Sequence, residues 1–248
     1  MVESAFLATS FDDLFEVSAS HAHAVAIMVA ATVLYLAYDL AIGRKVVARL
    51  FPSAASEEQL RTAVSFFRKA VGTVLLGLVP CIPAALLLPG GLAACGLSLD
   101  EAPRSLLLAG GFVLLMLPLL LVQSRRPMFL RNYPEVRVPF TRRIALWNAL
   151  GWTTYLLAYE LFFRGFLVLG LAPHIGPLPA LAASLMAYVF VHLGRYPGEV
   201  LGTLVTGSVF GLVALDTGSI LMPFLAHLGV ALTSDTLAAR HLLASPDA

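Results

Sequence analysis

Charged side chains are scarce in this chain. Only 12% of the 248 residues are Asp, Glu, Lys or Arg, whereas 59% are hydrophobic, and the mean hydropathy is +0.86. Soluble domains carry about 25% charged residues, so this composition excludes an ordinary soluble globule. A net charge of +1 leaves no long basic face for nucleic acid. Because each spanning helix needs roughly 20 apolar residues, we expect an all-α, polytopic transmembrane helix bundle of about seven spans, or eight.

The usual metal-binding spacings are also lacking. Cys81 and Cys95 are the two cysteines, both lie in apolar stretches, and they show no CxxC spacing. We therefore predict that they are small buried side chains rather than a disulfide or a metal site. HExxH, the spacing typical of zinc proteases, does not occur in the sequence.

Charge clusters separate the apolar runs into segments of membrane-spanning length. The segment 57–69 has an amphipathic pattern, with Phe66 and Phe67 on its apolar side, which predicts a surface-lying helix. The segment 90–99 is interpreted as a re-entrant or interfacial piece. The predicted spans are 20–43, 70–90, 104–124, 144–170, 178–196, 199–215 and 219–239, of which 144–170 is long enough to require a tilt.

Basic residues predict the orientation of these spans. Arginine supplies 14 of the 16 basic residues, which we take as a sign of bacterial origin. The acidic residues at 3–16 should then face outward and both basic loops the cytoplasm, as expected for an N-out, C-in, multi-pass protein of the inner membrane. Twelve of the 16 lie in two loops: Arg44, Lys45, Arg49, Arg61, Arg68 and Lys69 in one, and Arg125, Arg126, Arg131, Arg137, Arg142 and Arg143 in the other.

Ionisable side chains are costly inside a bilayer and by default mark a functional site. The fourth predicted span places Glu160 and Arg164 four residues apart, on one helical face where they can pair. The fifth contains His192, and the seventh contains His227, with Asp235 two turns further on the same face. Each has a structural alternative, since Glu–Arg pairs and single histidines often only tie helices together.

Depth indicates whether these side chains can share a site. At a rise of 1.5 Å per residue from the outer ends of the spans, Glu160 lies roughly 15 Å deep, His192 roughly 21 Å and His227 roughly 12 Å. All three fall near the middle of a core about 30 Å thick. A carboxylate or an imidazole there can take a proton from water, while the other imidazole binds the developing oxyanion.

Two weaker signals are interpreted as structural. The DTGS sequence at 216–219 occurs once, whereas aspartic proteases need two facing aspartates, so we predict a turn there. Gly207 and Gly211 have the spacing of a close helix-packing face.

Three motifs follow one another in the C-terminal half in an order known from one protease family. The family's first motif, EExxxR followed by glycine, reads Tyr159-Glu160-Leu161-Phe162-Phe163-Arg164-Gly165 here, and its second, FxxxH, reads Tyr188-Val189-Phe190-Val191-His192. The third, HxxxN, begins at His227 after a TGS turn. Over about 145–239 the chain therefore resembles the CPBP intramembrane proteases, which include CAAX prenyl endopeptidases and bacteriocin-processing and self-immunity (Abi-like) proteins.

Three positions depart from the family pattern. Tyr159 occupies the place of the first glutamate, to which the general-base role is usually assigned, Ala231 replaces the asparagine, and Tyr188 replaces phenylalanine. Two hypotheses follow. Either Glu160 takes the base role, with Tyr159 or Ser234 assisting at the oxyanion, or the chain is a catalytically weakened relative.

For an active enzyme, the resemblance implies cleavage of a membrane-anchored or hydrophobic peptide or protein. Glu160 and His192 would activate water, His227 would stabilise the oxyanion, Arg164 would orient Glu160, and Tyr188 and Asp235 would support them. Two histidines and a carboxylate also satisfy the ligand count of a catalytic zinc. Zinc held by Glu160, His192 and His227 is therefore an alternative to the metal-free, cofactor-free reaction that we favour.

Two other classes of function compete with proteolysis. One is a non-catalytic immunity or scaffold protein that binds a membrane peptide in the same cavity. The other is a small transporter, for which inverted repeats are typical and the sequence shows none. In all three cases membrane lipids surround a single integral-membrane domain, in which 1–143 supplies transmembrane and amphipathic helices and 144–248 supplies the protease-like core.

Overall fold

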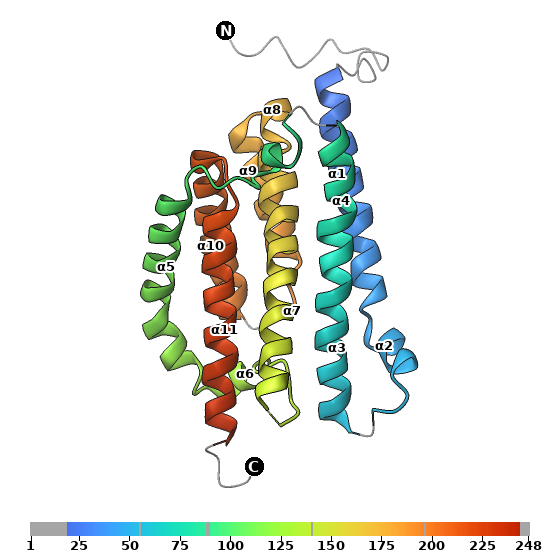
Figure 1. The fold of residues 1–248 in the computed structure, drawn as a ribbon, viewed down its shortest axis with the longest axis vertical. Helices are drawn as coiled ribbons and strands as arrows, with labels where there is room; N and C mark the ends of the chain where they lie inside the picture. Colours follow the sequence, from blue (N-terminus) through green and yellow to red (C-terminus); the bar gives the residue numbers. More distant parts are fainter. Residues whose placement is uncertain (1–18, 55, 88–89, 140, 196, 244–248) are drawn as a thin grey trace.

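The computed structural model describes residues 19–54, 56–87, 90–139, 141–195 and 197–243. Within these ranges every regular element is a helix, as predicted (Figure 1). The acidic residues at 3–16 lie outside the described part. The elements are α1 (Ala19–Ala41), α2 (Arg44–Leu50), α3 (Glu57–Gly72), η1 (Thr73–Leu78), α4 (Val79–Leu87), η2 (Gly91–Cys95), α5 (Ala102–Gln123), α6 (Pro127–Leu130), α7 (Arg142–Glu160), η3 (Leu161–Leu169), α8 (Ala172–Ile175), α9 (Pro177–Phe190), α10 (Pro197–Thr217) and α11 (Leu221–Leu243).

In the described part of the chain, 6 helices are long and apolar enough to cross a membrane. They are formed by α1, α3 to α4, α5, α7 to η3, α10 and α11. The helix in the predicted span 178–196 is shorter, because α9 has 14 residues and ends at Phe190, which gives a length of about 21 Å. α1 begins and α11 ends at opposite ends of the bundle (Figure 1), the arrangement that an odd number of crossings produces.

The segment 57–69, predicted to lie on the membrane surface, is instead the first part of a long rod. α3 continues through η1 into α4 (Figure 1), and Glu57–Ile82 is a candidate span. Its polar face turns inward, where Thr62, Ser65 and Lys69 are buried and α3 packs on α7. The prediction was wrong because an amphipathic pattern does not reveal whether its polar face meets lipid headgroups or a polar interior.

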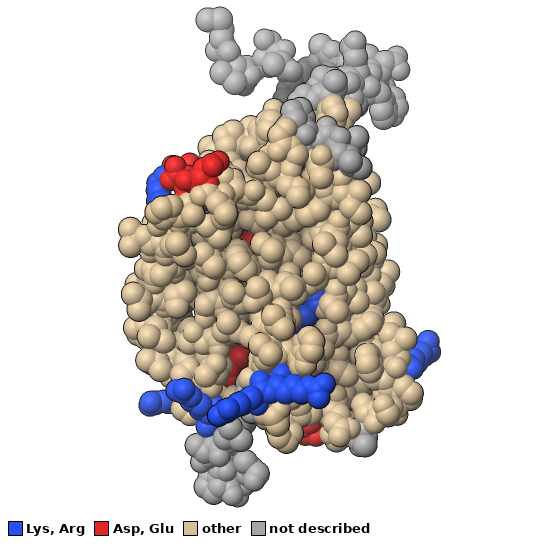
Figure 2. All heavy atoms as spheres, viewed as in Figure 1, with Lys and Arg blue, Asp and Glu red and all other residues tan. Residues whose placement is uncertain are grey.

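Figure 2 shows Lys and Arg side chains concentrated towards one end of the molecule, whereas Asp and Glu side chains are visible towards both ends. Lys and Arg form a belt near the end where α7 begins with the exposed Arg142 and Arg143. At the other end Asp216 pairs with Arg104. The positive-inside rule assigns the belt to the cytoplasmic side. This distribution favours the N-out, C-in orientation, which stays a prediction.

Both signals set aside as structural have structural roles. An added Cβ at Gly207 would lie 2.7 Å from Leu185 Cδ1, and one at Gly211 would lie 2.3 Å from Leu181 Cδ1. These two glycines therefore allow α10 to pack closely on α9. The DTGS segment ends α10 with Asp216 and Thr217 and turns towards α11 at Gly218, which has a φ of +62°. Its Asp216 side chain is 56% exposed, so both predictions are confirmed.

A nine-residue π-helix, η3, continues α7 and begins directly after Glu160. π-helical turns are rare and frequent at functional sites. Gly165 allows η3 to contact the η2 turn, since an added Cβ at this position would lie 2.7 Å from the backbone carbonyl oxygen of Cys95. Cys95 is fully buried in this contact, as predicted, whereas Cys81 is only partly buried, and both are free thiols.

We expect Gly165→Ala to destabilise the protein, because the new methyl group meets the backbone carbonyl of Cys95 as well as the Leu161 side chain, and the backbone cannot move aside as a side chain can. Overpacking of this kind costs about 1–3 kcal/mol. Gly111→Ala in α5 is the matched control, since a Cβ there has nothing within 4 Å. Thermal unfolding in detergent, followed by circular dichroism, should show a lower melting temperature for Gly165→Ala only. Equal melting temperatures would mean that η2 is free to move away from η3.

Candidate functional site

The Glu160 carboxylate is fully buried at the junction of α7 and η3. Its Oε1 lies 2.6 Å from Nδ1 of His227 on α11, and its Oε2 lies 3.0 Å from Nη1 of Arg164 in η3. The structure therefore brings together three of the four residues selected as the site from the sequence. The Glu160 carboxylate thus contacts the imidazole of His227 on α11 and the guanidinium of Arg164 in η3.

The Arg164 guanidinium is 1% exposed and is enclosed by aromatic rings. It lies 4.2 Å from the ring centre of Tyr188 and 5.4 Å from that of Phe210. Although its charge faces Glu160 at 3.0 Å, that contact is not aligned as a hydrogen bond, so Glu160 Oε2 and Arg164 Nη1 are both buried without a hydrogen-bond partner. Both atoms keep hydrogen-bonding capacity that a reacting molecule can use.

His227 is partly buried, with 21% of its side chain exposed. Since an ionised carboxylate only accepts hydrogen bonds, the 2.6 Å contact with Glu160 requires the proton on Nδ1 of His227. This assignment leaves Nε2 of a neutral His227 as a hydrogen-bond acceptor. His227 is thus oriented by the carboxylate and keeps one ring nitrogen for another molecule.

His192 lies just beyond the end of α9 and is held by Tyr188. Its Nδ1 lies 2.7 Å from the Tyr188 carbonyl oxygen, which only accepts, so Nδ1 donates and Nε2 is again the acceptor. The His192 ring lies 4.8 Å from the Tyr188 ring, which also contacts Arg164. Tyr188 therefore links His192 to the Glu160–Arg164 pair.

Tyr159 and Ala231, which depart from the family motifs, are both buried, with 5% and 6% exposure. The Tyr159 ring lies edge to face with His227 at 5.8 Å and 5.9 Å from Tyr188. Ala231 packs in the same apolar cluster. A tyrosine ring and a methyl group thus stand where the family has a carboxylate and an amide.

Residues 142–233 match the family model described as type II CAAX prenyl endopeptidase Rce1-like. This segment is an Rce1-like domain of the CPBP family. The resemblance inferred from the motifs is therefore confirmed for this segment, which is similar to a family of membrane proteases. No curated protein and no solved structure matches the chain.

The Rce1-like domain does not fit a three-ligand metal centre. Among the residues that the structure describes, no group of three His, Cys, Asp or Glu side chains is placed to hold a metal ion. Glu160 is already engaged by His227, and the positive charge of Arg164 at 3.0 Å opposes a further cation beside it. The alternative zinc set of Glu160, His192 and His227 thus has no support in this geometry.

Asp235, two turns beyond His227, joins a different polar cluster. Its Oδ2 accepts hydrogen bonds from Asn148 Nδ2 at 2.9 Å and Trp152 Nε1 at 2.7 Å, both on α7. Its Oδ1 accepts one from the backbone N–H of Glu135 at 3.2 Å. Asp235 therefore fastens α11 of the Rce1-like domain to α7, and Ser234 beside it in the chain is buried.

A further set of buried charges adjoins Asp235 and was missed by the sequence analysis. Glu135, in the loop before α7, pairs with Arg68 and lies 3.3 Å from Lys69 Nζ. Lys69 also donates to Asn148 Oδ1 at 2.9 Å. Hydropathy assigns charges in loops and at helix ends to water, so the only signal for this set was the position of Lys69 at the edge of the predicted span 70–90.

Burial by itself raises the pKa of the Glu135 carboxyl, but the charges of Arg68 and Lys69 outweigh that effect and lower the pKa from 4.5 to about 2. A carboxyl group with a lowered pKa in the folded state stabilises the fold when it is ionised. Its contribution is complete above about pH 4.5 and is lost as the pH falls towards 2.

We expect the wild-type protein to lose of the order of 3 kcal/mol of stability between pH 4.5 and 2 from this group. Glu135→Gln should be less stable than wild type at pH 7, and its melting temperature should change less over that window. Thermal unfolding of both proteins in one detergent, at intervals from pH 7 to 2, measures the difference. If the melting temperatures of the two proteins differed by the same amount from pH 7 to 2, the lowered pKa assigned to Glu135 would be contradicted.

Proposed function

We propose that this protein is an intramembrane endopeptidase that hydrolyses a peptide bond in a membrane-anchored or hydrophobic protein or peptide. The observation that carries the proposal is the buried contact of 2.6 Å between Glu160 Oε1 and His227 Nδ1. Hydrolases use a carboxylate on one imidazole nitrogen to prepare the other nitrogen to take a proton from the nucleophile. The family match over 142–233 supports the same class of reaction.

In the proposed reaction, Nε2 of His227 accepts a proton from water while the water oxygen attacks the peptide carbonyl carbon. The Glu160 carboxylate compensates the charge of the imidazolium that forms. When the C–N bond breaks, the imidazolium returns its proton to the leaving amine. The products are a new carboxyl group, which carries the water oxygen, and a new amine.

This proposal gives Glu160 a different role from the water activation expected from the sequence. Its carboxylate is fully buried and faces His227 on one oxygen and Arg164 on the other. Such a carboxylate is better placed to orient an imidazole than to take a proton from water. Arg164 supplies a fixed positive charge that holds the carboxylate in place.

His192 and Tyr159 provide the remaining polar groups of the proposed mechanism. Because Nδ1 of His192 is committed to the Tyr188 carbonyl, Nε2 can accept a hydrogen bond from the attacking water and orient it. The Tyr159 ring lies against His227, and we assign its hydroxyl as the donor to the oxyanion. A tyrosine can fill that role where the family's asparagine is replaced by Ala231.

The rest of the chain would support this core. Helices of the N-terminal part, 1–143, pack on those of the C-terminal part, 144–248, through the pairs α3–α7 and α5–α11. We place the whole protein in a bacterial inner membrane as a multi-pass domain surrounded by lipid. The basic belt at one end favours the N-out, C-in orientation in that membrane (Figure 2).

Cleavage of a panel of membrane-anchored peptides by purified variants tests the assignments. We expect Glu160→Gln, His192→Ala and His227→Ala each to lower kcat by about 10²-fold or more, since general-base catalysis contributes about 10² to 10⁴. Tyr159→Phe should lower kcat by about 10²-fold, the effect of losing one oxyanion donor.

Two exposed residues provide matched controls for this series. Glu101→Gln and His23→Ala change the same residue types on other helices and should cleave like wild type. Circular dichroism must show equal helix content for all variants. Full activity of Glu160→Gln, with normal folding, would exclude the carboxylate–imidazole pair as the base.

Chelation provides a separate test of the mechanism. We expect cleavage to persist after prolonged treatment with EDTA or 1,10-phenanthroline, because the described residues do not gather three metal ligands. The rate before and after treatment, with a zinc protease as positive control, is the measurement. A rate that falls with chelator and recovers with added zinc would contradict the metal-free reaction.

A second candidate function is a non-catalytic protein that binds a membrane peptide in the same site. The specific observation in its favour is that Tyr159 and Ala231 replace a carboxylate and an amide of the family motifs and are both buried. This candidate predicts peptide binding without cleavage by wild type, and unchanged binding by Glu160→Gln.

A further inference from the structure

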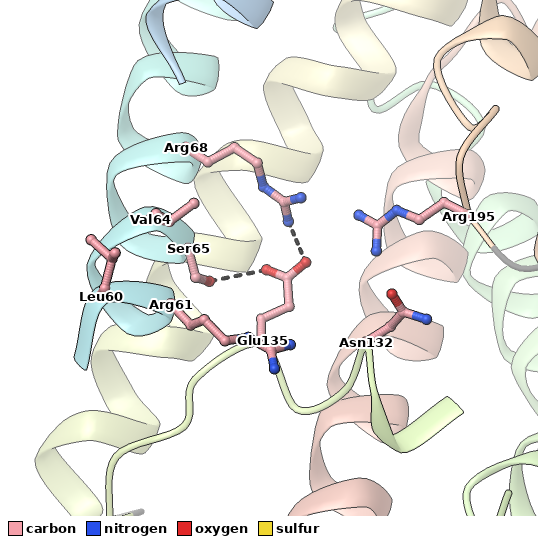
Figure 3. Close-up of a pocket in the computed structure, with 8 residues that line it drawn as sticks. All are labelled: Leu60, Arg61, Val64, Ser65, Arg68, Asn132, Glu135 and Arg195. Atoms are coloured by element: carbon pink, nitrogen blue, oxygen red, sulfur yellow. Dashed lines mark hydrogen bonds and ion pairs between the residues drawn. The ribbon is translucent and has the colours of Figure 1, made fainter. Parts of the chain in front are cut away.

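A polar hollow lies between α3, the loop that carries Asn132 and Glu135, and Arg195 (Figure 3). Its volume is about 210 Å³. Three guanidinium groups and a single carboxylate line it, so its lining has an excess of positive charge. The lining residues are Leu60, Arg61, Val64, Ser65, Arg68, Asn132, Glu135 and Arg195.

The charged side chains that line this hollow differ in how closely they are paired. Glu135 is held by Arg68 and Lys69 and accepts a hydrogen bond from Ser65. Arg195 pairs with Glu199, whose Oε1 lies 3.8 Å from the Arg195 Nε. Figure 3 shows the Arg195 guanidinium pointing across the hollow towards Arg68. The guanidinium groups of Arg68 and Arg195 therefore face one space, and the carboxylate of Glu135 in that space is already paired with Arg68 and Lys69.

A second cavity, an apolar groove of about 610 Å³, is also lined by the connection between α9 and α10. It runs between α1, η3 and α9 and is lined by Met28, Leu36, Phe162, Met186, Phe190 and Leu193, among others. Leu193 of the groove and Arg195 of the hollow are two residues apart in the same short connection between α9 and α10. A positively charged hollow and an apolar groove are thus lined by residues of one short connection.

We infer that the two together bind one anionic phospholipid, with its phosphate between Arg68 and Arg195 and an acyl chain in the groove. Guanidinium groups bind phosphate oxygens in a bidentate manner. Basic pockets between helices on the cytoplasmic side are typical sites for anionic lipid headgroups. α3 starts at the end of the bundle that carries the basic belt (Figures 1 and 2), which is where lipid phosphates would lie. This inference does not depend on the proposed protease activity.

Native mass spectrometry of the detergent-purified protein can test the site with phosphatidylglycerol and phosphatidylcholine of identical chains. Wild type should retain phosphatidylglycerol preferentially. Arg195→Gln should weaken retention by about fivefold, the contribution of one basic side chain near a membrane surface. Arg143→Gln, an exposed residue of the same belt that does not line the hollow, is the matched control and should bind like wild type.

A second variant tests the chain-binding half of the site. Ala187→Phe fills the groove and should weaken retention of phosphatidylglycerol, while leaving weak binding of inorganic phosphate unchanged.

Four outcomes would overturn the inference. These are equal retention of phosphatidylcholine, equal effects of Arg195→Gln and Arg143→Gln, displacement of the lipid by millimolar inorganic phosphate, and displacement by a hydrophobic peptide with a free C-terminal carboxylate but not by its amide. The third would identify a free-phosphate site and the fourth a peptide site. Because the readout is binding, failure here is distinguishable from failure of the protease assay.

Discussion

The buried carboxylate of Glu160 is the constraint on which the rest of the structure depends. A charge in the interior of a membrane protein is tolerated only when partners compensate it. Arg164 provides one partner from the π-helix that follows, at 3.0 Å, and His227 provides the other from α11, at 2.6 Å. The positions of two further helices relative to α7 are therefore tied to this single side chain.

The surrounding elements hold that arrangement in register. Asp235, two turns beyond His227, binds Asn148 and Trp152 of α7, so α11 is fastened to α7 at a second level. In the middle of η3, directly after Arg164, Gly165 permits contact with the η2 turn. Because α11 and η3 are each fixed by a contact outside the site, His227 and Arg164 are presented to Glu160 in a fixed geometry, as proton transfer requires.

Aromatic rings pack around this polar centre. Tyr188 lies between Arg164 and His192, and Tyr159 lies between Tyr188 and His227. Rings of this kind exclude water from the ion pair and strengthen its electrostatic interactions. The second charged cluster, around Glu135, lies near the basic end of the molecule, so polar groups occur at two depths of an otherwise apolar bundle.

The sequence by itself predicted the all-helical membrane bundle, the family resemblance that the match over 142–233 confirms, and Glu160, Arg164 and His227 as side chains that the fold brings together. It could do so because a charged residue within an apolar run is conspicuous in a sequence. Only the tertiary structure decided that segment 57–69 enters the bundle, that Asp235 belongs to the Asn148–Trp152 cluster, and that Glu135 and Lys69 are buried together. Hydropathy records how apolar a segment is, whereas the direction in which a polar face turns depends on neighbours that lie far away in the chain. The length of α9 and the π-helical start of η3 were likewise decided by packing rather than by composition.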